Sequence, residues 1–425
     1  MSITIEGNEN DLHQQYETVY NKDTNLVKTS NDVPTPIACV EEMMDTIPDA
    51  FLKDGSKKWL DPCCGCGNFF VVACKRLMQY HSLEHILTNM LYFNDINADR
   101  IAVVREVFCE STYALHITEN DFLTYNPDIT FDIILANPPY AKLLPNGKRA
   151  SKNHNLIGVF IKQSLKLLNP NGYLLYITPD NWMSFADRNT LITELTSKQI
   201  VHLNIHTAKK YFKKIGSSFT WYLIENCPAY KNITVEGIWK GNNYTDSVES
   251  MSRKYIPLCY TQMVQNILRK TIDCETVPKI KVETSSYLHK YTKREFIRAE
   301  KDDEFKYKLW HTPKQIVWAN RPHKYQEGWK VFISTTSSYS TIVDNCGMTQ
   351  SIVFVRCDSK DDADQLAELL RHPLYIFINN ICRWGNFNNI RILQSFPRYD
   401  SYDSVYEQSG LTDEEKKYMV ENSIK

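Results

Sequence analysis

The chain has 425 residues, of which 43% are apolar and 23% are charged, and its formal net charge is −1. This length predicts about two domains, at the usual ~100–200 residues per domain. With 8 Trp, 25 Tyr and 18 Phe, the chain has ample core-forming side chains, which excludes intrinsic disorder. The near-zero net charge excludes a globally basic nucleic-acid coat protein, although a local basic surface remains compatible with it.

Apolar runs and cysteines narrow the class of protein further. No run approaches the ~20 apolar residues of a membrane-spanning helix, and the polar first residues predict no secretory signal. The twelve cysteines are not spaced as an extracellular disulfide framework, so we expect reduced thiols in a cytoplasmic protein. Three of them crowd at Cys63, Cys64 and Cys66. Structural zinc prefers two separated pairs of ligands, so we expect no metal there.

Short apolar runs alternate with helical periodicity between residues 59 and 178. The pattern predicts strands at 59–60, 91–93, 131–136 and 172–178, and helices at 69–80, 98–109 and 159–168. This alternation predicts an α/β fold with a Rossmann-like, doubly wound sheet that binds ligands at the carboxyl ends of its strands.

The sheet is expected to close on an antiparallel pair. Two apolar segments, 219–225 and 233–239, flank a Pro-containing turn and predict a β-hairpin. Beyond about residue 245 the pattern becomes irregular, so we place a boundary there. We expect a catalytic domain over 1–245 and a mixed α+β domain over 246–425.

A glycine loop follows the first predicted strand, in the run Asp61-Pro-Cys-Cys-Gly65-Cys-Gly67-Asn-Phe. The chain has only 14 glycines, so two at one strand–helix junction are notable, and glycine lets a backbone approach a ligand closely. The dinucleotide fingerprint is incomplete because Phe70 replaces its last glycine, and no Gly-Lys-Ser/Thr follows for a P-loop. We therefore expect a nucleotide-like cofactor, with Asp61 holding a cationic amino group.

Two further acidic positions follow the next two predicted strands. Asp95 ends the second strand, where a carboxylate accepts both hydrogen bonds of a ribose diol. Asp121 and Phe122 fall after a third strand of the sheet, expected ahead of them and before the strand 131–136, where they suit an adenine amino group and its ring. Each acid alone is typical of a turn or a helix cap, but their order along successive strands favours one cofactor site.

The strongest signal is Asn137-Pro138-Pro139-Tyr140, directly after the apolar strand 131–136. The prolines stiffen the turn, so the Asn137 side chain and the Pro138 carbonyl provide acceptors at fixed positions. Two such acceptors suit the two N–H groups of an exocyclic amine, and Tyr140 offers a face for a flat heterocycle. An ordinary proline turn would need neither the asparagine nor the aromatic residue.

A basic segment spans residues 279–330, with 13 Lys/Arg against 7 Asp/Glu, a net charge of +6. Residues 331–425 carry 9 against 13, a net of −4. Aromatic residues interleave with the basic ones in the first of these segments, as in surfaces that bind phosphates and stack on bases. A solvated charged face over an aromatic core is the alternative interpretation.

Together these motifs resemble the S-adenosylmethionine-dependent N6-adenine DNA methyltransferases, over roughly residues 30–240. The resemblance includes Thr35-Pro36 and the later segment Ser217-Ser-Phe219-Thr-Trp-Tyr. It implies cofactor contacts from Thr35, Pro36, Asp61, Pro62, Cys63, Gly65, Gly67, Asn68, Phe69, Asp95, Ile96, Asp121 and Phe122. It implies that Asn137, Pro138, Pro139 and Tyr140 are catalytic, and that Tyr140 and Phe219 contact the target adenine.

The order of the motifs resembles the gamma, TaqI-like group, in which a C-terminal domain recognises double-stranded DNA. The interval of 34 residues from Asp61 to Asp95 is longer than is usual in that group. In the C-terminal domain we assign DNA contacts to Lys290, Lys293, Arg294 and Arg298. The resemblance also implies a restriction-modification system, in which a monomeric methyltransferase acts separately from its cognate endonuclease.

The resemblance implies direct methyl transfer to the N6 of an adenine flipped out of the duplex. Two alternatives stay open. A protein glutamine N5-methyltransferase would grip a side-chain amide with the same tetrapeptide, although such enzymes are usually shorter and lack a large C-terminal domain. An RNA base methyltransferase is the other. The basic, aromatic 279–330 segment favours nucleic acid over protein.

Overall fold

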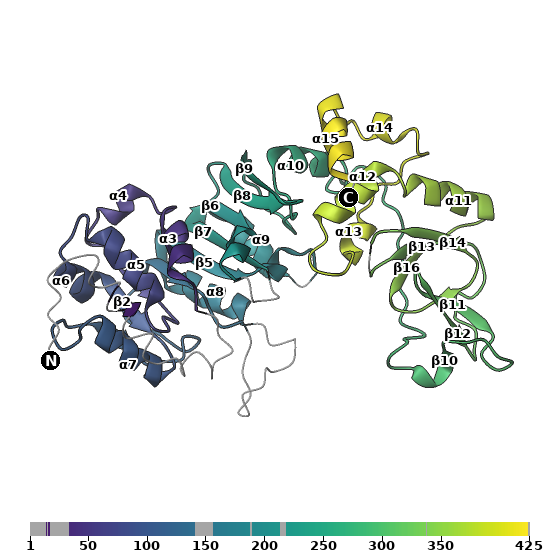
Figure 1. Cartoon of the computed structure of the whole chain (residues 1–425). Coiled ribbons are helices and arrows are strands. Elements are labelled where there is room, and N and C mark those ends of the chain that lie inside the picture. The colour runs from purple at the N-terminus through teal and green to yellow at the C-terminus, as the bar shows by residue number, and fades with distance from the viewer. Residues whose placement is uncertain are drawn as a thin grey trace. The chain divides into compact units, whose positions relative to one another are not determined.

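The computed structural model describes residues 14, 16, 17, 34–140, 156–187, 189–212, 218–336 and 338–423 (Figure 1). The chain folds into two compact units. The first takes the residues up to Asp180 together with Thr190–Arg253, and the second takes Asn181–Asn189 together with Lys254–Lys425.

A nine-stranded sheet forms the centre of the first unit, in the order β3-β2-β1-β4-β5-β7-β6-β8-β9. Its strands are β1 (Trp59–Asp61), β2 (Leu91–Asn94), β3 (His116–Thr118), β4 (Phe131–Ala136), β5 (Leu168–Pro179), β6 (Lys198–Ile205), β7 (Phe219–Pro228), β8 (Ile233–Trp239) and β9 (Asn242–Val248). The five strands from β3 to β5 run parallel, and β7 is antiparallel to both of its neighbours. The predicted α/β fold with a doubly wound sheet is confirmed.

Helices cover both faces of this sheet. They are α3 (Ile37–Met44), α4 (Asp49–Leu52), α5 (Asn68–Leu77), α6 (Leu83–His85), the π-helix η1 (Ile86–Met90), α7 (Ala98–Val107), α8 (Ile157–Leu167), α9 (Thr190–Thr196) and the 3₁₀ turns η2 (Asp180–Met183) and η3 (Thr207–Lys210). Ile133 and Leu135 of β4 join one buried cluster with residues of α3, α5 and α7. On the other face, the hydroxyl of Ser164 in α8 lies 2.5 Å from the Tyr176 hydroxyl of β5.

The predicted hairpin between residues 219–225 and 233–239 is wrong. Strand β7 lies between β5 and β6, and β8 pairs with β6 in parallel and with β9 in antiparallel register. The first six residues of β7 are buried, because a continuous apolar run belongs to a central strand with both faces covered. The polar strand β9 forms the exposed edge, so the hairpin that closes the sheet is β8–β9.

The second unit mixes two small sheets with helices, as predicted for an α+β region. One sheet has the order β10-β12-β11-β15 and the other β14-β13-β16. Their strands are β10 (Ile297–Arg298), β11 (Tyr307–Thr312), β12 (Gln315–Ala319), β13 (Lys330–Ser334), β14 (Thr341–Asp344), β15 (Gly347–Met348) and β16 (Ile352–Arg356). The helices are α10 (Gln262–Lys270), the turn η4 (Arg294–Phe296), α11 (Lys360–Leu369), α12 (Pro373–Ile381), α13 (Ile390–Gln394), α14 (Val405–Gln408) and α15 (Asp413–Ser423).

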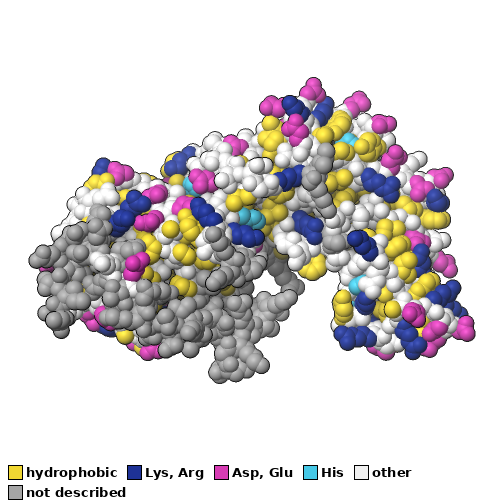
Figure 2. Space-filling model, viewed as in Figure 1, with side chains coloured by type: hydrophobic (Ala, Val, Ile, Leu, Met, Phe, Trp, Pro, Cys, Tyr) yellow, Lys and Arg dark blue, Asp and Glu magenta, His cyan; other side chains and the backbone are white. Residues whose placement is uncertain are grey.

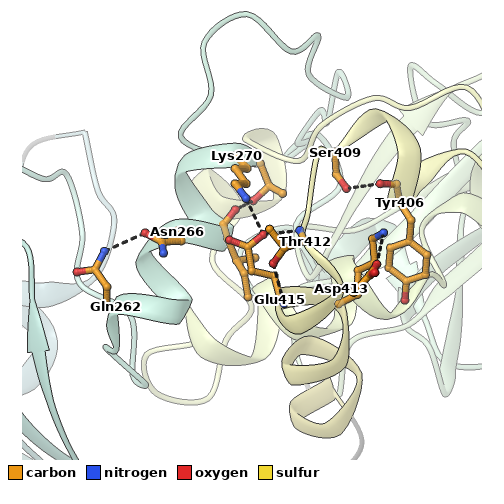
Figure 3. Close-up of polar contacts among 11 residues, drawn as sticks. Gln262, Asn266, Lys270, Tyr406, Ser409, Thr412, Asp413 and Glu415 are labelled. Carbon is orange, nitrogen blue, oxygen red and sulfur yellow. Dashed lines mark hydrogen bonds and ion pairs between the residues drawn. The ribbon is translucent and has the colours of Figure 1, made fainter.

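A buried carboxylate ties α15 to α10 within the second unit (Figure 3). Glu415 Oε2 lies 2.7 Å from Lys270 Nζ and accepts a 2.7 Å hydrogen bond from the backbone N–H of Thr412. The Thr412 hydroxyl in turn accepts from the backbone N–H of Glu415, at 3.2 Å. This reciprocal capping satisfies N–H groups that the first turn of a helix leaves without intrahelical partners.

Candidate active site

The candidate active site lies in the first unit, where β1, β2 and β4 end. These strands are parallel neighbours, so their carboxyl ends share one edge of the sheet. Asp61 is the last residue of β1, Asp95 directly follows β2, and Asn137 directly follows β4. Three of the predicted residues are therefore brought to one edge.

The glycine loop makes the turn from β1 into α5. Gly67 has φ 93°, and a Cβ there would lie 2.6 Å from the Phe108 ring, so only glycine fits. Gly65 has φ 56°, and apart from its own atoms and those of its two chain neighbours no heavy atom of the described residues lies within 4 Å of where its Cβ would be. The loop thus presents a bare stretch of backbone at Gly65, which suits close approach by a ligand.

Asp61 is buried, with 1% of its surface exposed. Its Oδ1 accepts a 3.2 Å hydrogen bond from the backbone N–H of Cys63. Burial raises the pKa of this carboxyl well above its usual range, and the nearby charge of Asp95 raises it further. Within the described residues no basic side chain pairs with Asp61, so a cationic ligand group fits this position.

Asp95 holds the glycine loop in place. Its Oδ2 accepts from the backbone N–H of Gly65 at 2.8 Å, and its Oδ1 accepts from that of Asn97 at 2.9 Å. Each carboxylate oxygen has a second lone pair, so the predicted ribose contact stays a prediction. The neighbouring Ile96 is 72% exposed, which suits contact with a flat ligand ring.

Asp121 and Phe122 follow β3 in a tight turn. Asp121 is exposed, and its Oδ1 accepts from the backbone N–H of Leu123 at 3.0 Å. Phe122 is only 2% exposed, and its ring centroid lies 5.4 Å from that of Phe160 in α8. Most of the Phe122 surface is thus used in packing, and its contact with a cofactor adenine remains a prediction.

The tetrapeptide is held from several directions. Asn137 Nδ2 donates to Thr35 Oγ1 at 3.0 Å, and the Tyr140 hydroxyl donates to Asn137 Oδ1. The Cys63 thiol lies 3.7 Å from the backbone carbonyl of Asn137. Pro138 is buried, whereas Asn137, Pro139 and Tyr140 are half-buried. The asparagine amide is therefore oriented, and its oxygen faces the tyrosine.

A second aromatic residue lies beside Tyr140. The ring centroid of Phe219, in β7, is 5.8 Å from that of Tyr140 and 4.6 Å from that of Phe212. Phe219 is buried, so its contact with a target base remains a prediction. Ser217, the first residue of the segment that carried this prediction, lies outside the described residues.

The remaining predicted cofactor residues support the glycine loop and its surroundings. Asn68 Nδ2 donates to the backbone carbonyl of Thr35 at 2.8 Å, and Pro36 precedes the first turn of α3. Phe69 packs in the core, and the Pro62 carbonyl accepts a 2.9 Å hydrogen bond from Asn94. The Cys63 thiol, predicted to contact the cofactor, also lies against the tetrapeptide.

Sequence reasoning missed Asn94. This fully buried side chain donates to the carbonyls of Pro62 and Asn120 and accepts from the Thr118 hydroxyl at 2.7 Å. It thereby joins the loops that follow β1, β2 and β3. An asparagine at the end of an apolar strand, directly before Asp95, was the signal available in the sequence.

The basic cluster of the second unit consists of Lys290, Lys293, Arg294 and Arg298. Arg294 and Arg298 are exposed, and the two lysines are half-buried. Arg298 lies 3.3 Å from the Asp302 carboxylate and its guanidinium 4.1 Å from the centroid of Phe305. Figure 2 shows basic side chains interspersed with acidic ones over the region of β10 to β12. Part of the positive charge is therefore already paired.

Three negative findings apply to the described ranges. No group of three His, Cys, Asp or Glu side chains is placed to hold a metal ion among these residues. All twelve cysteines are described, and each is a free thiol. No helix found in the described part of the chain is long and apolar enough to cross a membrane.

Residues 70–212 match the family of Eco57I restriction-modification methylases. The chain is similar to the Type II methyltransferase M.VspI of Vibrio sp. (strain 343), with 27% identity over 214 residues that cover 47% of this chain and 49% of the relative. It is also similar to a Type II methyltransferase of Thermus thermophilus, with 33% identity over 89 residues, 17% of this chain and 21% of that one. The chain thus spans about half the length of the first relative and about a fifth of the second.

Among solved structures, the fold is similar to that in the cryoEM structure of the DrdV–DNA complex. The TM-score is 0.55 at 11% sequence identity, and the match covers 97% of this chain and 59% of that chain. This likeness concerns the fold. In sequence, the similarity of the chain lies with restriction-modification methyltransferases.

Proposed function

We propose that the protein is the methyltransferase of a restriction-modification system, and that it transfers a methyl group from S-adenosylmethionine to the N6 of an adenine in double-stranded DNA. One observation carries this proposal. The oriented amide of Asn137 and the buried carboxyl of Asp61, which pairs with no basic side chain of the described residues, lie at the ends of neighbouring parallel strands, so an acceptor for an amine stands beside a position for a cationic cofactor.

The residues at the strand ends fit this cofactor. Asp61 would bind its ammonium group, Asp95 its ribose hydroxyls, and Ile96 with Asp121 and Phe122 its adenine. Gly65 would let the cofactor approach the backbone, as its open surroundings allow. When bound, the cofactor supplies an electrophilic methyl group on a sulfonium. The chain's own residues supply position and electrostatics, with no covalent enzyme intermediate.

The tetrapeptide would bind the target amine. Asn137 Oδ1 and the Pro138 carbonyl accept its two hydrogens, which directs the nitrogen lone pair toward the methyl group. In the present structure the Tyr140 hydroxyl donates to Asn137 Oδ1, so the amine would replace this donor. The base must leave the duplex first, at a cost of a few kcal/mol, which stacking on Tyr140 and contact with Phe219 would offset.

We assign the second unit to DNA recognition, as in the gamma, TaqI-like group. Its basic cluster runs from the loop before η4 into β10, in a segment rich in aromatic residues, a composition that suits phosphates and bases. In this arrangement the first unit would be catalytic and the second would read the target. The protein would act as a monomer, separately from a cognate endonuclease that cuts the same site.

Radiolabelled methyl transfer tests this function. Purified protein and labelled S-adenosylmethionine are offered unmethylated duplex DNA, structured RNA and a glutamine-containing release-factor-like protein in parallel. We expect label in DNA, recovered as N6-methyladenine after digestion to nucleosides. Label in the protein substrate would instead establish the glutamine methyltransferase, because Asn137 and Pro138 can grip a side-chain amide equally well.

A further inference from the structure

The amide of Asn137 is held by a residue 102 positions earlier in the chain. Its Nδ2 donates to Oγ1 of Thr35, a residue with 2% of its surface exposed, over 3.0 Å. An amide nitrogen only donates and an amide oxygen only accepts. An acceptor on one side therefore determines that Oδ1 points to the other side, where the Tyr140 hydroxyl meets it.

Thr35 is itself fixed by the glycine loop. Its backbone carbonyl accepts a 2.8 Å hydrogen bond from Nδ2 of Asn68, the buried first residue of α5. Asn68 directly follows Gly67, so two consecutive hydrogen bonds connect the loop after β1 to the tetrapeptide after β4. The Asn68–Thr35 bond is buried, and in the part-buried Asn137–Thr35 bond the acceptor residue Thr35 is itself buried, which limits replacement of that acceptor by solvent.

We propose that Thr35 is a positioning residue for methyl transfer, whose hydroxyl oxygen holds the Asn137 amide with Oδ1 toward the target amine. This inference rests on the proposed function and deepens it. The sequence resemblance implies a contact between Thr35 and the cofactor, and the hydrogen bond to Asn137 adds a role toward the other substrate. With the acceptor removed, the amide gains a rotated state in which Nδ2 faces the amine, and two donors repel each other.

Two variants at this position separate the hydroxyl oxygen from the side-chain shape. Thr35→Val keeps the branched shape and loses the acceptor, whereas Thr35→Ser keeps the acceptor and loses a methyl group. Under single turnover, with DNA and S-adenosylmethionine saturating, we expect Thr35→Val to lower the transfer rate constant about 10- to 100-fold, the range for a lost buried hydrogen bond. Thr35→Ser should stay within about threefold of the wild type, because it retains that hydrogen bond.

A matched control comes from Thr196, another buried threonine of the first unit. Its hydroxyl donates to the Ile192 carbonyl at 2.8 Å and accepts from the backbone N–H of Arg253 at 2.9 Å, all outside the tetrapeptide and the glycine loop. Thr196→Val should lower the melting temperature without lowering the transfer rate constant. The proposal is overturned if Thr35→Val transfers as fast as this control, or if Thr35→Ser is as slow as Thr35→Val.

A second readout does not depend on activity. In a ¹⁵N-labelled full-length chain, the side-chain amide resonances of Asn137 are assigned by their loss in Asn137→Asp. We expect Thr35→Val to move them and Thr196→Val to leave them unchanged, because only the first removes their acceptor. Unmoved resonances would refute the Thr35 contact. A wild-type protein that methylates no DNA would refute the proposed function alone, since this measurement stands without it.

Discussion

Replacing Asp61 by Asn tests whether the buried carboxyl at the end of β1 serves a cationic ligand. The side chain is 1% exposed, and burial, followed by the charge of Asp95, holds its pKa well above the usual range. An amide has the same shape and still accepts the hydrogen bond from the Cys63 N–H. The substitution therefore removes the charge and little else.

In the ligand-free protein this change should be stabilising. A carboxyl with a raised pKa in the folded state favours folding while it is protonated, and this contribution is lost as the pH rises through the folded pKa. The advantage of Asp61→Asn should thus be absent near the unfolded pKa of about 3.9 and grow toward neutral pH. Replacing a destabilising residue at a functional position typically raises the free energy of unfolding by about 0.5–2 kcal/mol, which raises the melting temperature by about 1–8 °C for a unit of this size.

Cofactor binding should change in the opposite direction. Loss of a charge-assisted hydrogen bond typically costs about 1.5–3 kcal/mol, so calorimetry should show S-adenosylmethionine affinity falling about 10- to 150-fold. The wild-type affinity should rise with pH as Asp61 ionises, and that dependence should be much weaker in Asp61→Asn. The half-buried Asp54 provides a control, because its carboxylate accepts hydrogen bonds from Ser56, away from the strand ends. A folded Asp61→Asn protein with lower stability and unchanged affinity would refute this reasoning.

Three further sets of variants probe Tyr140 of the tetrapeptide, the basic cluster, and the contact between α10 and α15 in the second unit. Tyr140→Phe should keep the transfer rate at or above that of the wild type, because the ring remains and the hydroxyl no longer competes for Asn137. Tyr140→Ala should lower the transfer rate about 5- to 150-fold, because the ring on which the base stacks is lost. Equal rates for the two variants would contradict a stacking role. Changing all four residues of the basic cluster to Gln should reduce the slope of log DNA affinity against log salt concentration by about 0.9 per lost phosphate contact. We expect fewer than four contacts to be lost, because Arg298 already pairs with Asp302. An unchanged slope would mean that the cluster is a solvated face. Glu415→Gln should lower the free energy of unfolding, measured by chemical denaturation, by about 1–3 kcal/mol, because it leaves the Lys270 charge without its partner. An unchanged free energy of unfolding would mean that the pair is only a surface contact.

The strands that the sequence predicts well are those whose apolar run is complete. Strand β4 has the predicted bounds, because five of its six residues are apolar and the Asn-Pro-Pro turn that follows ends the strand. Strand β6 was not predicted, since Gln199, His202 and Asn204 interrupt its apolar residues and yet are buried. Gln199 is satisfied by the backbone N–H groups of Tyr230 and Lys231, more than thirty positions away. Because the sequence pattern does not predict β6, it pairs β7 with β8, whereas in the structure β6 lies between them, so the predicted hairpin is wrong.

In the candidate site, too, local sequence pattern predicts some features, and contacts between distant residues determine the others. Parallel strand ends meet at one edge of a sheet, so a pattern of strand followed by Asp or Asn is enough to group Asp61, Asp95 and Asn137. Local pattern does not determine that Asp95 accepts a hydrogen bond from Gly65, or that Thr35 reaches Asn137 across 102 residues. Such contacts depend on how the segment before α3 packs against α5, where Asn68 binds the Thr35 carbonyl. Short sequence motifs therefore predict which residues form the site, but the orientation of the Asn137 amide depends on tertiary packing.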